Sequence, residues 1–321
     1  ALFKFAGACL GHRKGGVAMA AVGACAGFGA ICGSSLATAA TMGKVALPEL
    51  RRLGYSGALS TGALAAGGTL GILIPPSVIL IIYSILTEQN IAKMFLCAFI
   101  PGLLAALGYI VAISLYVRLN QNSGPIKDRV PWKDRMYLFK NIWHIILIFV
   151  VMIGGIYMGF FTPTEGAAIG AAGTGIIAIT NKSFNIKSFI EVIESTAVTT
   201  GMIFFVLLGA EFFNSFIALT QLPNLLTEFS KENNLEPLIV VACIMILYLF
   251  LGCLMDSLAM ILLTIPVFFP LVMSLDFGLS PEETAIWFGI LTLVVVEVGL
   301  ITPPVGLNVF IINKMAKDVP I

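Results

Sequence analysis

Residues Gly29–Thr41 read GAICGSSLATAAT, and this short stretch decides how the first part of the chain folds. Glycine and serine interrupt a long apolar segment here, and Ser34 or Ser35 suits the N-cap of a helix that starts anew. The end of the first helix leaves carbonyl groups unpaired, and the start of the second leaves N–H groups unpaired. Carbonyl oxygens suit Na⁺, and the positive start of a helix suits an anion. The stretch therefore predicts an ion or substrate site; a tight helix contact made by small residues is the alternative.

The composition of the whole chain indicates that lipid is its main solvent. Of the 321 residues, 59% are hydrophobic and only 11% are charged, against about 25% charged residues in a soluble domain. The net charge of +1 provides no basic surface, so we expect no binding of nucleic acid. Helices satisfy their own backbone hydrogen bonds in a lipid bilayer. The expected fold class is therefore an all-α polytopic membrane protein.

The sequence also argues against an enzyme. It contains two histidines and six cysteines, and none of the cysteines has the spacing of metal ligands. A Ser-His-Asp set, an HExxH motif and a GxxxxGK[ST] loop are all missing from the sequence. We therefore expect no catalytic residues, no organic cofactor and no ATP-driven transport by the chain itself.

Long apolar stretches predict membrane helices, because each is near or above the roughly 20 residues that cross a bilayer. These stretches are 57–86, 94–117, 142–161, 166–180, 191–221 and 284–312. Two further stretches, 17–47 and 237–274, are interrupted in the middle by polar residues and predict re-entrant helical hairpins. The polar segment 119–141 predicts a linker between two halves.

The distribution of basic residues supports this layout. If both hairpins return to the side from which they enter, fourteen Lys and Arg residues fall on one side of the membrane, against Lys93 and Lys231 on the other. The positive-inside rule then places the richer side, with the 119–141 linker, in the cytoplasm. The residues on that side are Arg13, Lys14, Arg51, Arg52, Arg118, Lys127, Arg129, Lys133, Arg135, Lys140, Lys182, Lys187, Lys314 and Lys317.

The two halves of the sequence resemble each other. Gly33–Ala37 (GSSLA) matches Met255–Ala259 (MDSLA), and Gly71–Pro76 (GILIPP) matches Gly299–Pro304 (GLITPP). The predicted topology makes the first hairpin enter from the cytoplasm and the second from outside. This pattern predicts an inverted repeat, which is an architecture of many secondary transporters.

The first repeat is expected at 1–118 and the second at 142–321, and they are unequal in length. Residues 142–236 precede the second hairpin, whereas only residues 1–16 precede the first. The second half also has no counterpart of the 94–117 helix. We therefore expect that parts of the repeats are missing at both ends of this sequence.

Each Pro-Pro pair is expected to break a membrane helix. Proline lacks an N–H and clashes with the preceding turn, so carbonyl groups near Gly71–Ile74 and Gly299–Thr302 should be left free. Two matching breaks, each following a hairpin with a polar tip, favour a paired ion or substrate site over two simple kinks.

Four acidic residues fall within or beside apolar segments: Glu165, Glu211, Asp256 and Glu297. Acids inside a membrane are costly and are functional candidates. The sequence TPTE that ends in Glu165 reads as a capping box with proline at the first helical position, which gives Glu165 a structural role. Asp256 lies at the tip of the second hairpin, where it can neutralise a cation or cap the next helix. The sequence assigns no partner to Glu211 or Glu297.

Four motifs carry a resemblance to a known family. They are GSSLAT at Gly33–Thr38, FTPTEG at Phe161–Gly166, MDSLAMILLTIPVFFP at Met255–Pro270 and GLITPPVGLN at Gly299–Asn308. In this order they resemble the large M subunit of tripartite ATP-independent periplasmic (TRAP) transporters. The resemblance implies a Na⁺-driven, elevator-type importer of organic acids such as C4-dicarboxylates or sialic acid in the bacterial inner membrane. It also implies two partners, a small four-helix membrane subunit and a periplasmic substrate-binding protein.

The resemblance implies which residues bind Na⁺, with backbone carbonyls as the main ligands. The first Na⁺ site would comprise Cys32, Ser34, Gly71, Ile74 and Pro76, and the second would comprise Asp256, Gly299, Thr302 and Pro304. Cys32 stands where the family often has serine, which weakens the first site only if the hydroxyl is a ligand. Residues beside these sites are candidate substrate contacts: Ser35, Thr38, Ser257, Pro75, Pro303 and Asn308.

One other transport mechanism remains open from the sequence, and a second is disfavoured. A stand-alone sodium–dicarboxylate symporter of another family could use similar hairpins and would need no binding protein. A passive channel would need a continuous polar pore, whereas two inverted hairpins favour alternating access.

Overall fold

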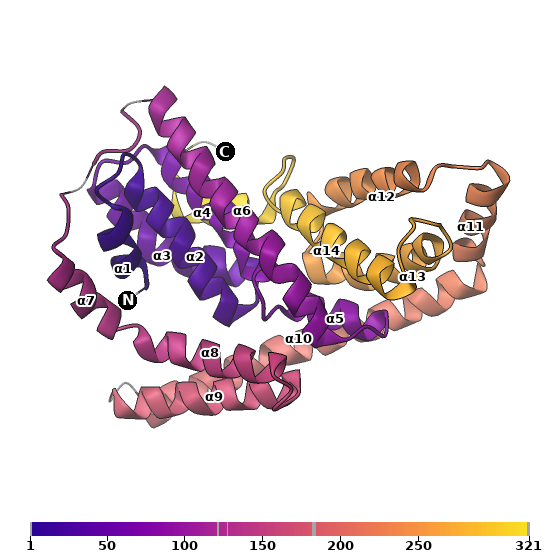
Figure 1. The fold of residues 1–321 in the computed structure, drawn as a ribbon, viewed down its shortest axis with the longest axis horizontal. Coiled ribbons are helices and arrows are strands. Elements are labelled where there is room, and N and C mark those ends of the chain that lie inside the picture. The colour runs from indigo at the N-terminus through magenta and orange to yellow at the C-terminus, as the bar shows by residue number, and fades with distance from the viewer. Residues whose placement is uncertain (1, 121, 127, 182–183, 320–321) are drawn as a thin grey trace.

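The computed structural model describes residues 2–120, 122–126, 128–181 and 184–319, and the regular elements in those ranges are helices (Figure 1). Lys127 and Lys182, which count among the basic residues that set the predicted orientation, lie outside the described residues. The helices are α1 Leu2–Leu10, α2 Gly16–Cys32, α3 Ser35–Arg52, α4 Gly57–Leu73, α5 Val78–Leu86, α6 Ile91–Leu119, α7 Trp132–Lys140, α8 Trp143–Tyr157, α9 Pro163–Thr180, α10 Ile186–Leu219, α11 Leu222–Glu232, α12 Pro237–Gly252, α13 Ser257–Met273, α14 Pro281–Gly299 and α15 Leu307–Met315.

Helices α2 and α3 cover the predicted 17–47 hairpin and pack on each other. Gly33 ends α2 with a φ of 64°, a left-handed conformation that favours glycine, and its N–H donates to Gly29 O at 2.8 Å. Ser34 is the N-cap of α3, where its hydroxyl accepts from the N–H of Ala37 at 3.4 Å. Of the two serines that suited this position, Ser34 is therefore the cap.

The first Pro-Pro pair separates α4 from α5, and the two helices differ in direction by 43°. α4 ends at Leu73, and Ser77 caps α5 by accepting from the N–H of Leu80 at 3.5 Å. Pro75 and Pro76 cannot donate to the preceding turn, which accounts for the loss of helix between Ile74 and Ser77.

The second half contains a similar pair of elements. α12 and α13 cover the predicted 237–274 hairpin, and Asp256 caps α13 by accepting from the N–H of Leu258 at 3.1 Å. α14 ends at Gly299, and the chain resumes as α15 only at Leu307. The predicted 284–312 helix is therefore interrupted at its Pro-Pro pair.

Several elements differ in extent from the expected segments. α7 lies inside the expected linker 119–141, and α11 follows α10, which is longer than the expected 191–221 helix. α9 begins with the capping box at Thr162 and Glu165, as the sequence predicted. Within the described part of the chain, α6 and α10 are each long and apolar enough to cross a membrane, and the bent pairs α4–α5 and α7–α8 qualify when joined. These apolar helices fit a multi-pass membrane protein.

The two halves interlock through their broken helices. α4 packs on α2 and α3, but α5, beyond the break, packs on α13 of the other half. α14 packs on α12 and α13, whereas α15 packs on α3 and α4. Figure 1 shows the α1–α4 group and the α11–α13 group at opposite ends, with α6 and α14 between them.

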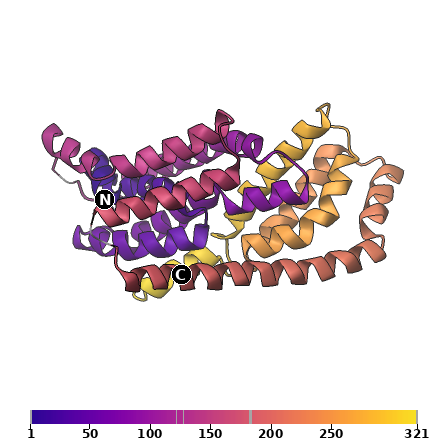
Figure 2. The same ribbon diagram turned by 90° about the horizontal axis from the view of Figure 1, so that it is seen from below.

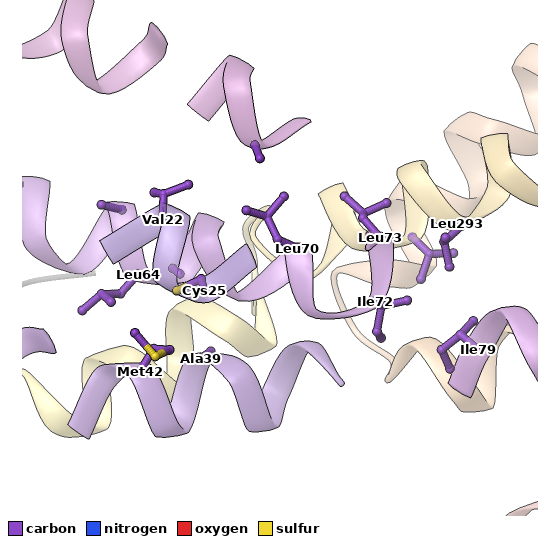
Figure 3. Packing of buried hydrophobic residues seen from close by; sticks show 14 of the residues in the cluster. Val22, Cys25, Ala39, Met42, Leu64, Leu70, Ile72, Leu73, Ile79 and Leu293 are labelled. Atoms are coloured by element: carbon purple, nitrogen blue, oxygen red, sulfur yellow. The ribbon is translucent and has the colours of Figure 1, made fainter. Parts of the chain in front are cut away.

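One continuous apolar core runs through this junction. It includes Leu70 and Leu73 of α4, Ile79 of α5 and Leu293 of α14, which lie around the first break in Figure 3. By contrast, α10 runs along one side of the molecule as a single long helix (Figure 2). Its side chains are largely uncovered, with Phe205 80% and Phe212 72% exposed. The packed junction is thus where a site can be held rigidly.

Candidate functional site between two hairpin tips

The first hairpin tip lies directly against the first helix break. A Cβ on Gly29 would lie 2.5 Å from Gly71 Cα, and a Cβ on Gly71 would lie 2.5 Å from Thr38 Oγ1 and 2.6 Å from Ser34 O. Both glycines are therefore required for the approach of α2 and α3 to α4. On the far side of the break, Pro76 O lies 3.2 Å from the place of a Cβ on Gly33. The tip is thus packed on both sides of the break.

The second tip meets the second break in a similar way. A Cβ on Gly252, at the end of α12, would lie 3.0 Å from Gly299 Cα, and one on Gly299 would lie 2.7 Å from Gly252 Cα. The N–H of Gly306 donates to Cys253 O at 3.3 Å, which ties the end of the break to the tip. In both halves, a glycine on the first arm of the hairpin touches a glycine just before the break.

The residues expected to form the first Na⁺ site all lie at the first junction. Ser34 and Cys32 flank Gly33 in the tip, and Cys32 is half-buried. Gly71 lies in the last turn of α4. Ile74 is the C-cap of that helix, and its N–H donates the last helical hydrogen bond, to Leu70 O at 3.1 Å. Pro76 follows in the break with its carbonyl toward the tip.

The residues expected to form the second Na⁺ site share fewer described contacts than those of the first site. Gly299 contacts the second tip, and Thr302 donates its hydroxyl to Val298 O at 2.6 Å. Asp256 is half-buried and is used as a helix cap, while Pro304 is exposed. Among the described hydrogen bonds, none joins Asp256 to Thr302.

The candidate substrate contacts divide between the two junctions. Pro75 lies in the first break, and Pro303 is exposed in the second. Thr38 and Asn308 are fully buried, and Asn308 reaches the first half by donating its amide to Ala65 O at 3.4 Å. Within the described residues, Thr38 Oγ1 and Asn308 Oδ1 accept no hydrogen bond, although buried acceptors are normally satisfied.

Glu297 is the residue that joins the remaining candidates, and the sequence assigned it no partner. Its side chain is 1% exposed. Ser35 donates its hydroxyl to Glu297 Oε2, and Ser257 donates to Oε1 at 3.1 Å. These serines lie 262 and 40 positions away in the chain, so helical spacing could not reveal the contact. The available signal was the equivalence of Ser35 and Ser257 in the two matching motifs, GSSLA and MDSLA.

Chemically, this region combines helix starts, helix ends and buried oxygens. The starts of α3 and α13 suit an anion, and the carbonyl ends of α2 and α4 suit a cation. The one buried acid in the cluster is hydrogen-bonded only to hydroxyl groups among the described residues. Helix ends and buried oxygens of these kinds are suited to ions and small polar molecules.

Comparisons with known proteins identify the family. The family model for the "Tripartite ATP-independent periplasmic transporter, DctM component" matches residues 1–321. The C4-dicarboxylate TRAP transporter large permease protein DctM of Pseudomonas aeruginosa is 37% identical over 98% of this chain and 72% of its own length. The protein of the same name from Vibrio cholerae is 33% identical over 98% of this chain and 73% of its own.

A third relative, the sialic acid TRAP transporter permease protein SiaT of Haemophilus influenzae, is 33% identical over 98% of this chain and 50% of its own length. These matches confirm the resemblance carried by the four sequence motifs. The chain therefore belongs to the family of DctM components, the large permeases of tripartite ATP-independent periplasmic transporters, which are transporters and not enzymes.

Proposed function

We propose that the chain is the permease subunit of a Na⁺-coupled secondary importer of small organic acids. In this proposal Na⁺ binds at the two junctions between hairpin tip and helix break. The substrate binds between the tips, and the hairpins with their broken helices move across the membrane as an elevator. A periplasmic binding protein delivers the substrate, and a small membrane subunit completes the complex in the bacterial inner membrane.

The observation that best supports this proposal is the close contact of each tip with its own helix break. Gly29 packs on Gly71, and Gly252 packs on Gly299, so the carbonyl end of α2 meets that of α4 and the carbonyl end of α12 meets that of α14. Unwound backbone beside buried helix ends is how secondary transporters hold coupling ions near the middle of the membrane. The buried Thr38 and Asn308 oxygens add side-chain ligands at the first junction.

The substrate class is inferred from charge and from the names of relatives. The relatives include permeases named for C4-dicarboxylate and for sialic acid, both of which carry carboxylates. The starts of α3 and α13 carry partial positive charge, which favours a carboxylate over a cation or a neutral sugar. We therefore propose a C4-dicarboxylate, sialic acid or a related carboxylate as the substrate.

The test is uptake by proteoliposomes that contain the permease carrying this chain, its small membrane subunit and its binding protein. We expect labelled succinate or sialic acid to accumulate with an inward Na⁺ gradient and not with an equal K⁺ gradient. Equal uptake with both gradients would exclude Na⁺ coupling. Full uptake without the binding protein would instead support the stand-alone symporter mechanism.

A further inference from the structure

Two serines in equivalent positions hold one carboxylate. Ser35 is the first residue of α3 and Ser257 is the first residue of α13, so each directly follows a hairpin tip. Ser35 Oγ donates to Glu297 Oε2, and Ser257 Oγ donates to Oε1 at 3.1 Å. Each oxygen of the carboxylate is thus bound by a different hairpin.

The three side chains are sealed from solvent. Ser35 is 0% exposed, and Ser257 and Glu297 are each 1% exposed. At this depth, water cannot replace a lost partner, so breaking either bond leaves a buried polar group unsatisfied. The ion pairs in the described residues, Arg51–Asp318, Arg52–Glu49 and Lys93–Glu282, do not include Glu297. The two serine hydroxyls are the described hydrogen-bond partners of the Glu297 carboxyl group.

The bridge connects an element of the second half to the hairpin of the first half. Glu297 lies near the end of α14, in the broken helix of the second half, whereas Ser35 belongs to the hairpin of the first half. The glycine contacts tie each tip to its own break but do not tie one tip to the other. A hydrogen-bonded path from tip to tip runs through the Glu297 carboxyl group.

We propose that Glu297 is a positioning residue that fixes the distance between the two hairpin tips, so that the starts of α3 and α13 face the substrate at a constant spacing. This inference rests on the proposed function, because the substrate is taken to bind between the tips. The role requires a side chain whose two terminal polar atoms can each hydrogen-bond to one of the serines. It does not require the negative charge of Glu297.

Two substitutions separate hydrogen bonding from charge. Glu297→Gln keeps the side-chain length and can accept from one serine while its amide donates to the hydroxyl of the other. Glu297→Met keeps a similar volume but makes neither bond. Thr292→Val is the matched control on α14, because the Thr292 hydroxyl is equally buried and has no hydrogen-bond partner among the residues that the structure describes.

The first measurement is substrate uptake by the complete reconstituted transporter. We expect Glu297→Gln and Thr292→Val to keep the substrate KM within about threefold of the parent. Glu297→Met should raise it by about tenfold or more, with a smaller change in kcat. If Glu297→Gln is as damaging as Glu297→Met, the charge of Glu297 is what matters and the proposal is wrong. If Glu297→Met is harmless, the bridge has no role.

The second measurement needs no transport and therefore remains informative if the proposed function fails. Thermal unfolding of the purified permease is followed for Ser35→Ala and Ser257→Ala, each in the parent and in the Glu297→Met background. We expect each serine substitution to lower Tm in the parent and to have little further effect in the Met background, because the partner is already lost. Strictly additive shifts in Tm would overturn the bridge even if uptake were Na⁺-driven.

Discussion

Asp256 has two possible tasks at the second hairpin tip, and the structure assigns one of them. Its carboxylate accepts a hydrogen bond from the N–H of Leu258 and so caps α13. The side chain is half-buried, which leaves room for a second role as a ligand of a cation. The repeat-equivalent cap in the first half, Ser34, is neutral. The two proposed Na⁺ sites would therefore differ in charge, although each contains the N-cap residue of a helix.

Substitution of Asp256 by Asn separates these tasks, because asparagine is an equally good helix cap. If the charge attracts Na⁺, uptake should need a higher Na⁺ concentration, with an affinity loss of about tenfold for each 1.4 kcal/mol of lost attraction. The measurement is uptake across a Na⁺ titration, with expression and assembly checked. An unshifted titration curve would leave Asp256 as a cap alone.

The glycine contacts at the first junction predict that adding one methyl group, at Gly71, lowers the stability of the protein. Gly71→Ala would place a Cβ 2.5 Å from Thr38 Oγ1 and 2.6 Å from the backbone of Ser34. Since backbone cannot move aside easily, we expect a loss of about 1–3 kcal/mol in the free energy of unfolding, measured by unfolding of the purified protein. Gly23→Ala is the control, because nothing lies within 4 Å of its added Cβ. Equal stability of the two variants would contradict the tight junction.

At the scale of elements, the helix breaks were predictable because their causes are local. Pro75 and Pro76 lack N–H groups. Gly33 has no Cβ, so it adopts the left-handed conformation that ends α2. The Thr162–Glu165 capping box was likewise encoded in four consecutive residues. Each of these signals acts within about one helical turn.

The remaining features depend on contacts that are distant in sequence. Glu297 was visible as an intramembrane acid, but its partners come from two other helices. The packing of α5 on α13 and of α15 on α3 could not be deduced from hydrophobic periodicity, because periodicity shows which face of a helix is apolar and not which other helix covers that face. α7 was not predicted as a separate helix within the expected linker, because its nine residues are largely polar or aromatic and form no apolar stretch.

The orientation of the hairpins is a prediction that belongs to this scale. Single cysteines at Arg52 and Leu279 probe the turns that follow the two hairpins, and both positions are exposed. Loss of the Arg52–Glu49 surface pair should cost little, about 0–1 kcal/mol. With the six native cysteines replaced, a membrane-impermeant maleimide should label position 52 from the cytoplasm and position 279 from the periplasm. Labelling of both from one side would exclude the inverted repeat.

At the scale of the whole molecule, each half contributes a helix that packs on the other half. α5 of the first half lies on α13, and α15 of the second half lies on α3. We therefore expect movement of one hairpin to displace the broken helix of the other half. This interlocking favours motion of both hairpins as one unit and agrees with the proposed elevator more readily than with two independent gates.

The exposed faces of the arm formed by α8, α9 and α10 lead to the last prediction. Phe205, Phe212 and Leu219 of α10 are 80%, 72% and 83% exposed, so lipid or a membrane partner must cover them. The family is that of tripartite transporters. We therefore expect proteoliposomes with the permease alone to show little uptake, and addition of both partners to restore it. The control is binding-protein addition without the small subunit, which should not restore transport. Full activity of the permease alone would show that neither the exposed arm nor the delivered substrate is required.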